Sequence, residues 1–346
     1  IKKEQLSKYT GAAIDAYSNN DYSTLADMIA KADTGNAEIQ FILGKCYQKG
    51  LAGYKVDFAK AVEWYQRAVS QNHAGAMNNL GTLYMEGKGV DKSASKAFSL
   101  YTTSAQFGCS VAQRNLAYMY LNGNGVQKNE KNAYDSFLKA AKNNDAISQR
   151  QVALLSYCSM GTQRNDKEIL MWLQKASEQN DSVAQQMLGA FYLTGVLGVQ
   201  DNHIAIELLS KSAEQNNSSA QALLGLCYAE GKAVEVDGPM AIHWLSKAAE
   251  QNDRNAQYAL FEIYYSGKIV PKDIALAVTY LKKSAVSNST AQRQLGICYW
   301  NGEGVEKNIA LAEDWLQKAH SNGDTKAQET LKMIRQQIKE QKENVL

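Results

Sequence analysis

Gly-x-Gly steps are the residues in this sequence whose spacing comes nearest to a chemical motif, because glycine-rich loops can cradle phosphate groups. Gly87 and Gly89 form one such step, and similar steps occur at 123–125 and 302–304. The dinucleotide-binding fingerprint needs a preceding strand and a third glycine three residues further on, where this chain has Lys92. No strand pattern precedes the step. We therefore interpret these glycines as parts of turns and predict no cofactor.

The histidines and cysteines could ligate a metal or act as nucleophiles. The four histidines have no histidine four residues on and no cysteine at metal-ligand spacing; they are His73, His203, His243 and His320. The five cysteines are odd in number and contain no CxxC pair, which argues against a disulfide framework: Cys46, Cys109, Cys158, Cys227 and Cys298. We predict no metal site and no catalytic residue. The alternative is an enzyme centred on Cys158 or on a cluster formed across the fold.

A repeat of about 36 residues runs through most of the sequence. Its marker is a Leu-Gly pair or a close substitute, spaced by 35 to 37 residues, starting at Leu43, Leu80, Leu116, Val152, Leu188, Leu224, Leu260 and Leu295. In most copies a small residue precedes the Leu by four positions, a Tyr follows the Gly by three, and another Gly follows the Tyr by three. The second half of the repeat reads Ala-x-x-Trp and then a small residue, as in 61–68, 241–248 and 312–319.

Each repeat is expected to form two helices. At about 100° per residue, the small, Leu, Gly and Tyr columns fall in one continuous arc, which would be the buried face of the first helix. The glycine after the Tyr can adopt the left-handed cap conformation at little cost and so ends that helix. In the fourth repeat Ser156 replaces the Tyr and Ser159 replaces this glycine, so we expect an irregular turn over Met160–Lys167.

A glutamine directly follows the small residue in nearly every repeat. The column lies inside the buried arc and comprises Gln40, Gln113, Gln149, Gln185, Gln221, Gln257, Gln292 and Gln328. Because a buried amide must be hydrogen-bonded, we predict a structural ladder in which each glutamine bonds to the adjoining helices. The alternative is a row of amides that reads a ligand.

Composition and charge narrow the function classes. Two prolines and a high share of Ala, Leu, Gln, Lys and Glu favour helix. The net charge is +2, with no long run of one sign, so we expect neither nucleic acid nor an anionic membrane as a partner. No apolar run approaches bilayer length, and we predict no membrane insertion. The chain starts at Ile1 without a methionine, so either a leader was removed or it begins inside a longer protein.

The repeat resembles the Sel1-like repeat, a relative of the tetratricopeptide repeat. Residues 76–90, AMNNLGTLYMEGKGV, and 291–305, AQRQLGICYWNGEGV, match the pattern AxxxLGxxYxxGxGV closely. The resemblance implies an all-α fold, a right-handed α-α solenoid (superhelix) of about eight helix-turn-helix repeats of about 36 residues with terminal caps. We expect an N-terminal degenerate repeat or cap at 1–36, eight repeats forming one solenoid at 37–324, and a C-terminal capping helix at 325–346.

Three columns of the first helices lie opposite the buried arc and line the inner surface in related helical solenoids. Crowding of successive first helices could bury part of these columns, chiefly their Leu and Ile members. Arg, Tyr and Trp dominate interface energetics. We therefore predict that a partner peptide or helix binds in a concave groove to Arg114, Tyr118, Arg150, Tyr157, Tyr258, Tyr265, Arg293 and Trp300.

The resemblance implies a non-enzymatic protein–protein interaction scaffold. Sel1-like relatives include adaptors of membrane-associated degradation complexes, bacterial factors that engage host proteins, and immunity proteins that neutralise secreted toxins. Asn- and Lys-rich turns favour a bacterial exported protein, so virulence-related host binding is our first expectation. The alternatives are a periplasmic immunity protein and an adaptor in a membrane-associated complex. A structural oligomer joined through solenoid ends is a third class; the charged C-terminal segment argues against it, and we expect a monomer.

Overall fold

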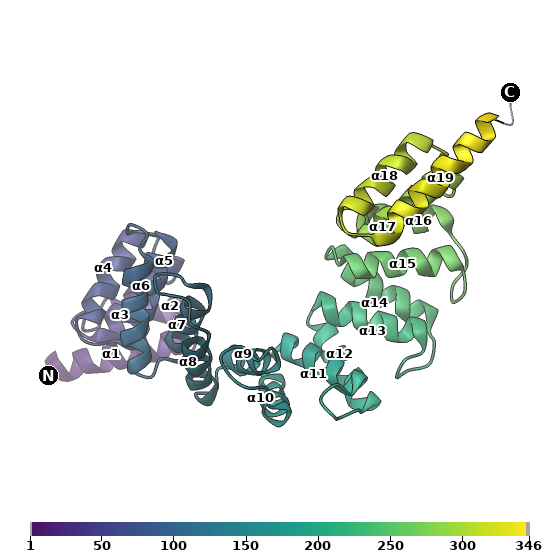
Figure 1. The fold of residues 1–346 in the computed structure, drawn as a ribbon. Coiled ribbons are helices and arrows are strands. Elements are labelled where there is room, and N and C mark those ends of the chain that lie inside the picture. The colour runs from purple at the N-terminus through teal and green to yellow at the C-terminus, as the bar shows by residue number, and fades with distance from the viewer. Residues whose placement is uncertain (1, 344–346) are drawn as a thin grey trace. The chain divides into compact units, whose positions relative to one another are not determined.

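The computed structural model describes residues 2–343 as helices joined by short turns, with no strand in that range (Figure 1). The helices are α1 (Lys2–Ser18), α2 (Tyr22–Ile29), α3 (Ala37–Lys49), α4 (Phe58–Val69), α5 (Ala74–Glu86), α6 (Ala94–Gln106), α7 (Ser110–Asn122), α8 (Glu130–Lys142), α9 (Ala146–Tyr157), α10 (Asp166–Glu178), α11 (Ser182–Thr194), α12 (Asn202–Glu214), α13 (Ser218–Glu230), α14 (Gly238–Glu250), α15 (Arg254–Ser266), α16 (Ile274–Ser284), α17 (Ser289–Asn301), α18 (Ile309–Ser321) and α19 (Thr325–Glu343). Residue 1 of the expected N-terminal cap and residues 344–346 of the expected capping helix lie outside the described residues. No helix within residues 2–343 is long and apolar enough to cross a membrane.

From α3 to α18 the helices alternate as the first and second helices of successive repeats. Each first helix packs most extensively against the second helix of its own repeat. Within the segments α3–α10 and α11–α18, each second helix packs next against the first helix that follows it along the chain. α1 and α2 form a further pair before the first repeat, and α19 packs on α18 after the last. The predicted fold class, an all-α solenoid of helix-turn-helix repeats, is confirmed.

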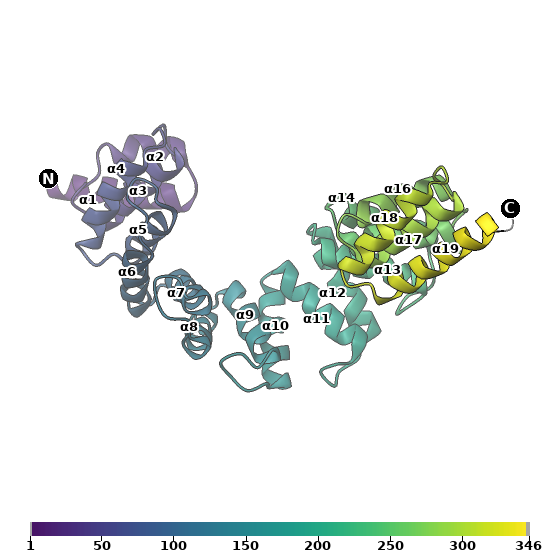
Figure 2. The same cartoon turned by 45° about the horizontal axis from the view of Figure 1, so that its top comes forward.

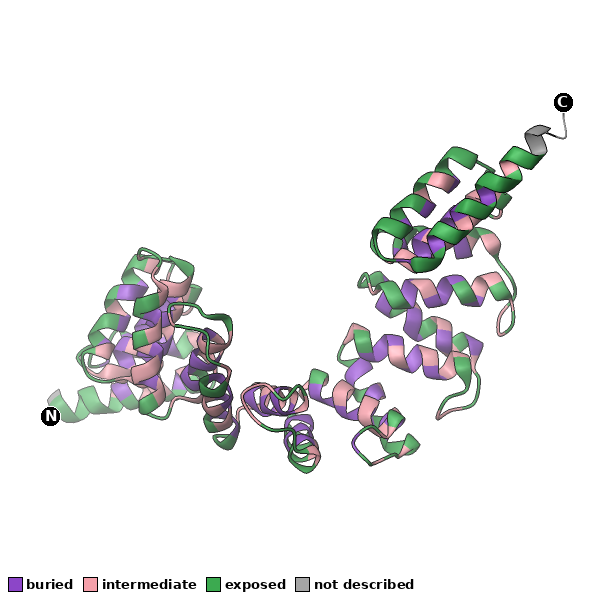
Figure 3. Cartoon of the chain, in the orientation of Figure 1, coloured by how far each residue is buried: buried purple, intermediate pink, exposed green. Residues whose placement is uncertain are grey.

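The chain divides into two compact units, Ile1–Gln179 with α1–α10 and Asn180–Leu346 with α11–α19. Within each unit the helices are stacked as antiparallel pairs, as a second view also shows (Figure 2). Buried residues lie where the helices of a unit face one another, and exposed residues cover the outer sides and the turns (Figure 3). The boundaries expected at 36/37 and 324/325 stay predictions.

Glycine ends seven of the eight first helices in the left-handed conformation, with φ between 66° and 73°. The exception is α9, after which Ser159 takes φ 56°. In this repeat the backbone N–H of Asn165 bonds to the Ser156 hydroxyl at 3.3 Å, whereas in the others the corresponding N–H bonds to the backbone carbonyl of the repeat's Tyr. The irregular turn predicted for Met160–Lys167 is confirmed, although α10 already begins at Asp166.

The buried glutamines of the first helices form the predicted ladder. Gln221 is 1% exposed; its Nε2 donates to the carbonyl of Ala213, in the preceding second helix, at 3.0 Å, and its Oε1 accepts from Nε2 of Gln251 at 2.8 Å. Equivalent side-chain pairs are Gln40–Gln71, Gln113–Asn143, Gln149–Gln179, Gln185–Gln215 and Gln292–Asn322. In each of these pairs the acceptor of the buried glutamine is occupied by a structural hydrogen bond, which supports the ladder over a ligand-reading row. The prediction was wrong for Gln328, which is exposed on α19, where no further helix follows within residues 2–343 to cover it.

The ladder is incomplete in the seventh repeat. Gln257 is 3% exposed and donates to the carbonyl of Ala249 at 3.1 Å, but its Oε1 has no hydrogen-bond partner among the described residues. The donor in other repeats lies thirty residues further on, and here that position is Ser287, whose side chain is shorter. A buried acceptor without a donor destabilises the fold by roughly 1–3 kcal/mol.

The substitution Ser287→Gln should supply the missing donor and raise the free energy of unfolding by about 1 kcal/mol, measured by chemical denaturation. In a Gln257→Ala background the same substitution should have no stabilising effect, because the acceptor is gone. An equal gain in both backgrounds would show that Ser287→Gln acts through another contact.

Candidate protein-interaction surface

We use the term first-helix face for the half-buried and exposed surface that the first helices of each unit present. Successive first helices contact one another directly, as α3 and α5 do in the first unit and α13 and α15 in the second. They therefore form a closely spaced row within each unit. All eight predicted partner-binding residues lie half-buried on this row, four on α7 and α9 and four on α15 and α17. Close packing of successive first helices, which the sequence led us to expect, thus buries part of each of these side chains.

In the first unit the two predicted tyrosines each contact neighbours on the same unit. The ring of Tyr118 stands edge-on to Phe137 at 5.0 Å between centroids, and its hydroxyl accepts from Nε2 of Gln151 at 3.1 Å. The guanidinium of Arg164 lies over the Tyr157 ring at 4.8 Å. Arg150 is half-buried on α9. This face therefore presents aromatic rings that are already oriented by packing.

In the second unit aromatic side chains follow one another along α15. Phe261 lies between Tyr258 and Tyr265, at 5.6 and 5.3 Å between ring centroids. The Tyr265 hydroxyl is hydrogen-bonded to the Glu303 carboxylate, and this bond, together with burial, raises the pKa of Tyr265 to about 12. On α17, Trp300 packs against the cluster formed with α19, and the Lys307 ammonium lies 5.3 Å from its ring centroid.

Two of the predicted arginines form ion pairs within their own unit. Arg114 Nη1 lies 2.5 Å from the Asp145 carboxylate, and Arg293 Nε lies 3.0 Å from the Asp324 carboxylate. Each aspartate also accepts backbone N–H groups at the start of the next first helix or of α19. Both carboxylates are at least nine-tenths buried, so these arginines hold the start of the following helix. Their structural role makes them unsuitable for testing partner binding.

Arg114→Ala should lower the free energy of unfolding by about 2 kcal/mol, because it leaves the buried Asp145 carboxylate without its cation. Arg335→Ala is the control, since the Arg335–Glu313 pair is largely exposed and should change stability by less than about 1 kcal/mol. Equal effects in chemical denaturation would contradict the structural role of Arg114.

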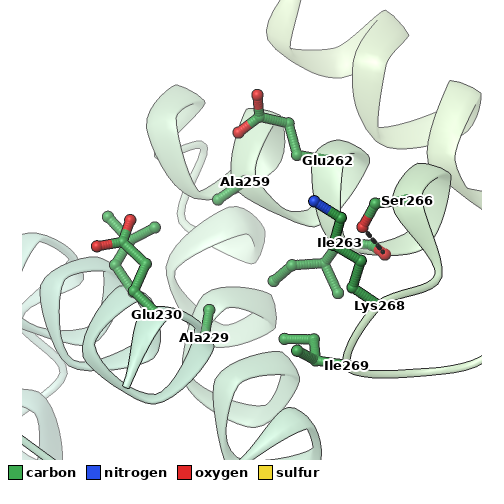
Figure 4. Close-up of a pocket in the computed structure, with 9 residues that line it drawn as sticks. Ala229, Glu230, Ala259, Glu262, Ile263, Ser266, Lys268 and Ile269 are labelled. Atoms are coloured by element: carbon green, nitrogen blue, oxygen red, sulfur yellow. Dashed lines mark hydrogen bonds between the residues drawn. The ribbon is translucent and has the colours of Figure 1, made fainter. Parts of the chain in front are cut away.

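A hollow of about 190 Å³ opens on the first-helix face of the second unit, between α13 and α15 (Figure 4). Its apolar lining includes Leu226 and Ala229 from α13, Ala259 and Ile263 from α15, and Ile269 from the turn that follows. A cavity of roughly 150 Å³ lined by apolar side chains accepts a molecule the size of benzene. The hollow can therefore take one apolar side chain from outside.

Charged groups surround the opening of the hollow. Glu230 comes from α13, Glu262 from α15, and Lys268 from the turn after α15 (Figure 4). Burial raises the pKa of the Glu262 carboxyl; a hydrogen bond with Tyr258 opposes the rise, and the nearby Glu230 carboxylate adds to it. The rim thus carries two carboxylates and one ammonium group.

The lining of the hollow was missed at the sequence level. Ala229 occupies a position that carries a larger side chain in every other repeat, namely Gln48, Met85, Leu121, Tyr157, Leu193, Tyr265 and Trp300. The same holds for Ala259, whose counterparts are Ile42, Asn79, Asn115, Gln151, Met187, Leu223 and Gln294. Two small residues in adjacent repeats leave the space open. The signal that could have revealed the hollow is a small side chain at a position where the other repeats carry larger ones. The sequence analysis searched these columns only for Arg, Tyr and Trp.

The cysteines and histidines take structural or surface positions. Burial raises the pKa of the thiols of Cys46, Cys227 and Cys298 to about 11, so these remain protonated at neutral pH. His73 caps α5 by accepting from the Ala76 N–H, and its other ring nitrogen lies 2.8 Å from Glu38. Across the described part of the chain, His, Cys, Asp and Glu nowhere gather as three or more that could hold a metal ion.

Comparison with known families now identifies the class of repeat. The Sel1 repeat family matches eight segments, 37–73, 74–106, 110–145, 146–181, 182–217, 218–253, 254–285 and 289–324. The chain belongs to the Sel1 repeat family, whose members generally mediate protein–protein interactions through a helical solenoid that is typically not enzymatic. No match is found among curated proteins.

Solved structures support the same assignment. A protective antigen present in uropathogenic Escherichia coli strains, with the same repeat fold, is similar at 28% identity and a TM-score of 0.84, over 97% of this chain and 73% of that one. A Sel1 repeat protein from Oxalobacter formigenes is 28% identical, with a TM-score of 0.68, over 91% of this chain and 89% of that one. An immunity protein from Pseudomonas aeruginosa is 21% identical, with a TM-score of 0.29, over 72% of this chain and 80% of that one.

Proposed function

We propose that this chain is a non-enzymatic scaffold that holds a partner protein on the first-helix face of its repeats. The observation that carries the proposal lies in the second unit, whose first-helix face combines the half-buried rings of Tyr258, Tyr265 and Trp300 with an open apolar hollow. Aromatic side chains held by packing give a large contact area at low entropic cost, and an apolar pocket beside them is the usual site of an anchor side chain.

Two features support an individual partner protein over other ligands. The net charge of +2 provides no extended field for nucleic acid. The buried glutamines, which could have bound a ligand, are occupied by hydrogen bonds between helices.

We assign six of the eight predicted contact residues to the partner: Tyr118, Tyr157, Tyr258, Tyr265, Trp300 and Arg150.

A host protein is the partner that we propose first. The similar structure from Escherichia coli is described as a protective antigen of uropathogenic strains. This supports, for the present chain, a bacterial exported protein that meets host molecules. The alternative is an immunity protein, whose partner would be a secreted toxin instead of a host protein.

The test compares three forms of the chain in pull-downs from candidate host lysates and from lysates of the source organism. The first-helix variant Tyr118→Ala/Tyr157→Ala/Tyr265→Ala should lose a partner that the unchanged chain captures, with an affinity loss of at least tenfold. The control variant Met171→Ala/Ile204→Ala/Leu311→Ala changes exposed apolar residues of second helices and should retain it. Melting temperatures of the variants are measured alongside, so that a loss of folding is recognised. A partner lost by the control and kept by the first-helix variant would place binding on the second helices.

A further inference from the structure

The hollow between α13 and α15 exists because two neighbouring repeats depart from the rest of the chain. Ala229 and Ala259 are small where the other repeats carry larger side chains, and they come from adjacent first helices. Figure 4 shows both bordering the space beside the side chains of Ile263 and Ile269. The space is therefore a local feature of this pair of repeats, on a face where the first helices otherwise crowd together.

The charges around the opening favour apolar ligands that carry a positive charge over those that carry a negative one. Glu230 and Glu262 are both exposed at the rim, and the Glu230 carboxylate is near enough to add to the rise in the pKa of Glu262. Lys268 is the cation that lines the same hollow, which leaves a net charge of −1. A ligand that brings a further cation to this rim relieves the repulsion between the carboxylates, and a ligand that brings an anion increases it.

We infer that this hollow binds a segment of a partner protein that carries an aliphatic side chain with a Lys or Arg within one helical turn of it. The aliphatic side chain enters the hollow against Leu226 and Ile263, and the cation lies between the Glu230 and Glu262 carboxylates. The inference rests on the proposed scaffold function and names the chemistry of the segment that one part of the first-helix face accepts.

Selection from short random peptides tests this directly. Peptides are selected on the immobilised full chain and counter-selected on Ala229→Leu, which restores to this position the leucine that occupies it in the third and fifth repeats. Because that variant carries a side chain which two other repeats accommodate, it should fold while filling the hollow. Peptides that bind only the unchanged chain should be enriched in Leu, Ile or Met next to Lys or Arg.

The charge variants separate this proposal from simple apolar binding. For the selected peptides, Glu262→Gln should weaken binding about tenfold, and Lys268→Ala should strengthen it several-fold by removing the rival cation. Glu214→Gln, an exposed carboxylate at the end of α12, is the control and should leave binding unchanged. Replacing the aliphatic residue of the peptide with Ala should cost about tenfold on the unchanged chain and little on Ala229→Leu.

Any of three results would overturn the inference. In the first, the peptides that depend on the hollow lack basic residues. In the second, no peptide distinguishes the unchanged chain from Ala229→Leu. In the third, binding is insensitive to both Glu262→Gln and Lys268→Ala. If Ala229→Leu also captures the same lysate partner as the unchanged chain, the scaffold function stands and only the assignment of the hollow is wrong.

Discussion

Hydrogen bonding of the buried glutamine, which seven of the eight first helices carry, is the interaction on which the arrangement of the repeats depends; α5 has Met77 at this position. An amide away from water must use its donor and its acceptor, and Gln221 does so by bonding to two different second helices at once. Such a bond set is satisfied in one relative position of three helices, whereas apolar contacts tolerate sliding. The alanines and leucines supply the stabilising burial, and the glutamines determine the register in which that burial occurs.

With the register held by buried residues, the first-helix face is free to vary from repeat to repeat. On this face Arg114 and Arg293 form ion pairs that hold the start of the next helix. Tyr118 and Tyr265 place aromatic rings on it. Ala229 and Ala259 leave a hollow between two first helices. The glutamines of the same helices keep their hydrogen bonds to backbone carbonyls at the ends of the preceding second helices. A scaffold that keeps its framework in one set of columns and its recognition in another can acquire a specific site without losing the fold.

The sequence predicts the framework well because its signals are local and repeated. The Leu-Gly spacing indicated the helix pairs, the column position of the glutamines indicated burial, and Ser159 in place of a glycine indicated the irregular turn. The roles of Arg114 and Arg293 could not be predicted, because their partners, Asp145 and Asp324, lie 31 residues away across a repeat boundary. A helical wheel gives the direction of a side chain but not the reach of an arginine. The hollow was missed for a related reason, since it depends on which volumes are absent from two neighbouring helices.

Site-specific photocrosslinking tests the central claim, that a partner protein lies on the first-helix face. A benzophenone amino acid would replace Tyr265 on α15 in one form of the chain and Ile204, an exposed residue of the second helix α12, in another. Both positions lie in the second unit, so the two forms differ in the face that they probe. The account predicts that a captured partner is crosslinked from position 265 and not from position 204. Crosslinking from position 204 alone would contradict it and place the partner on the second helices.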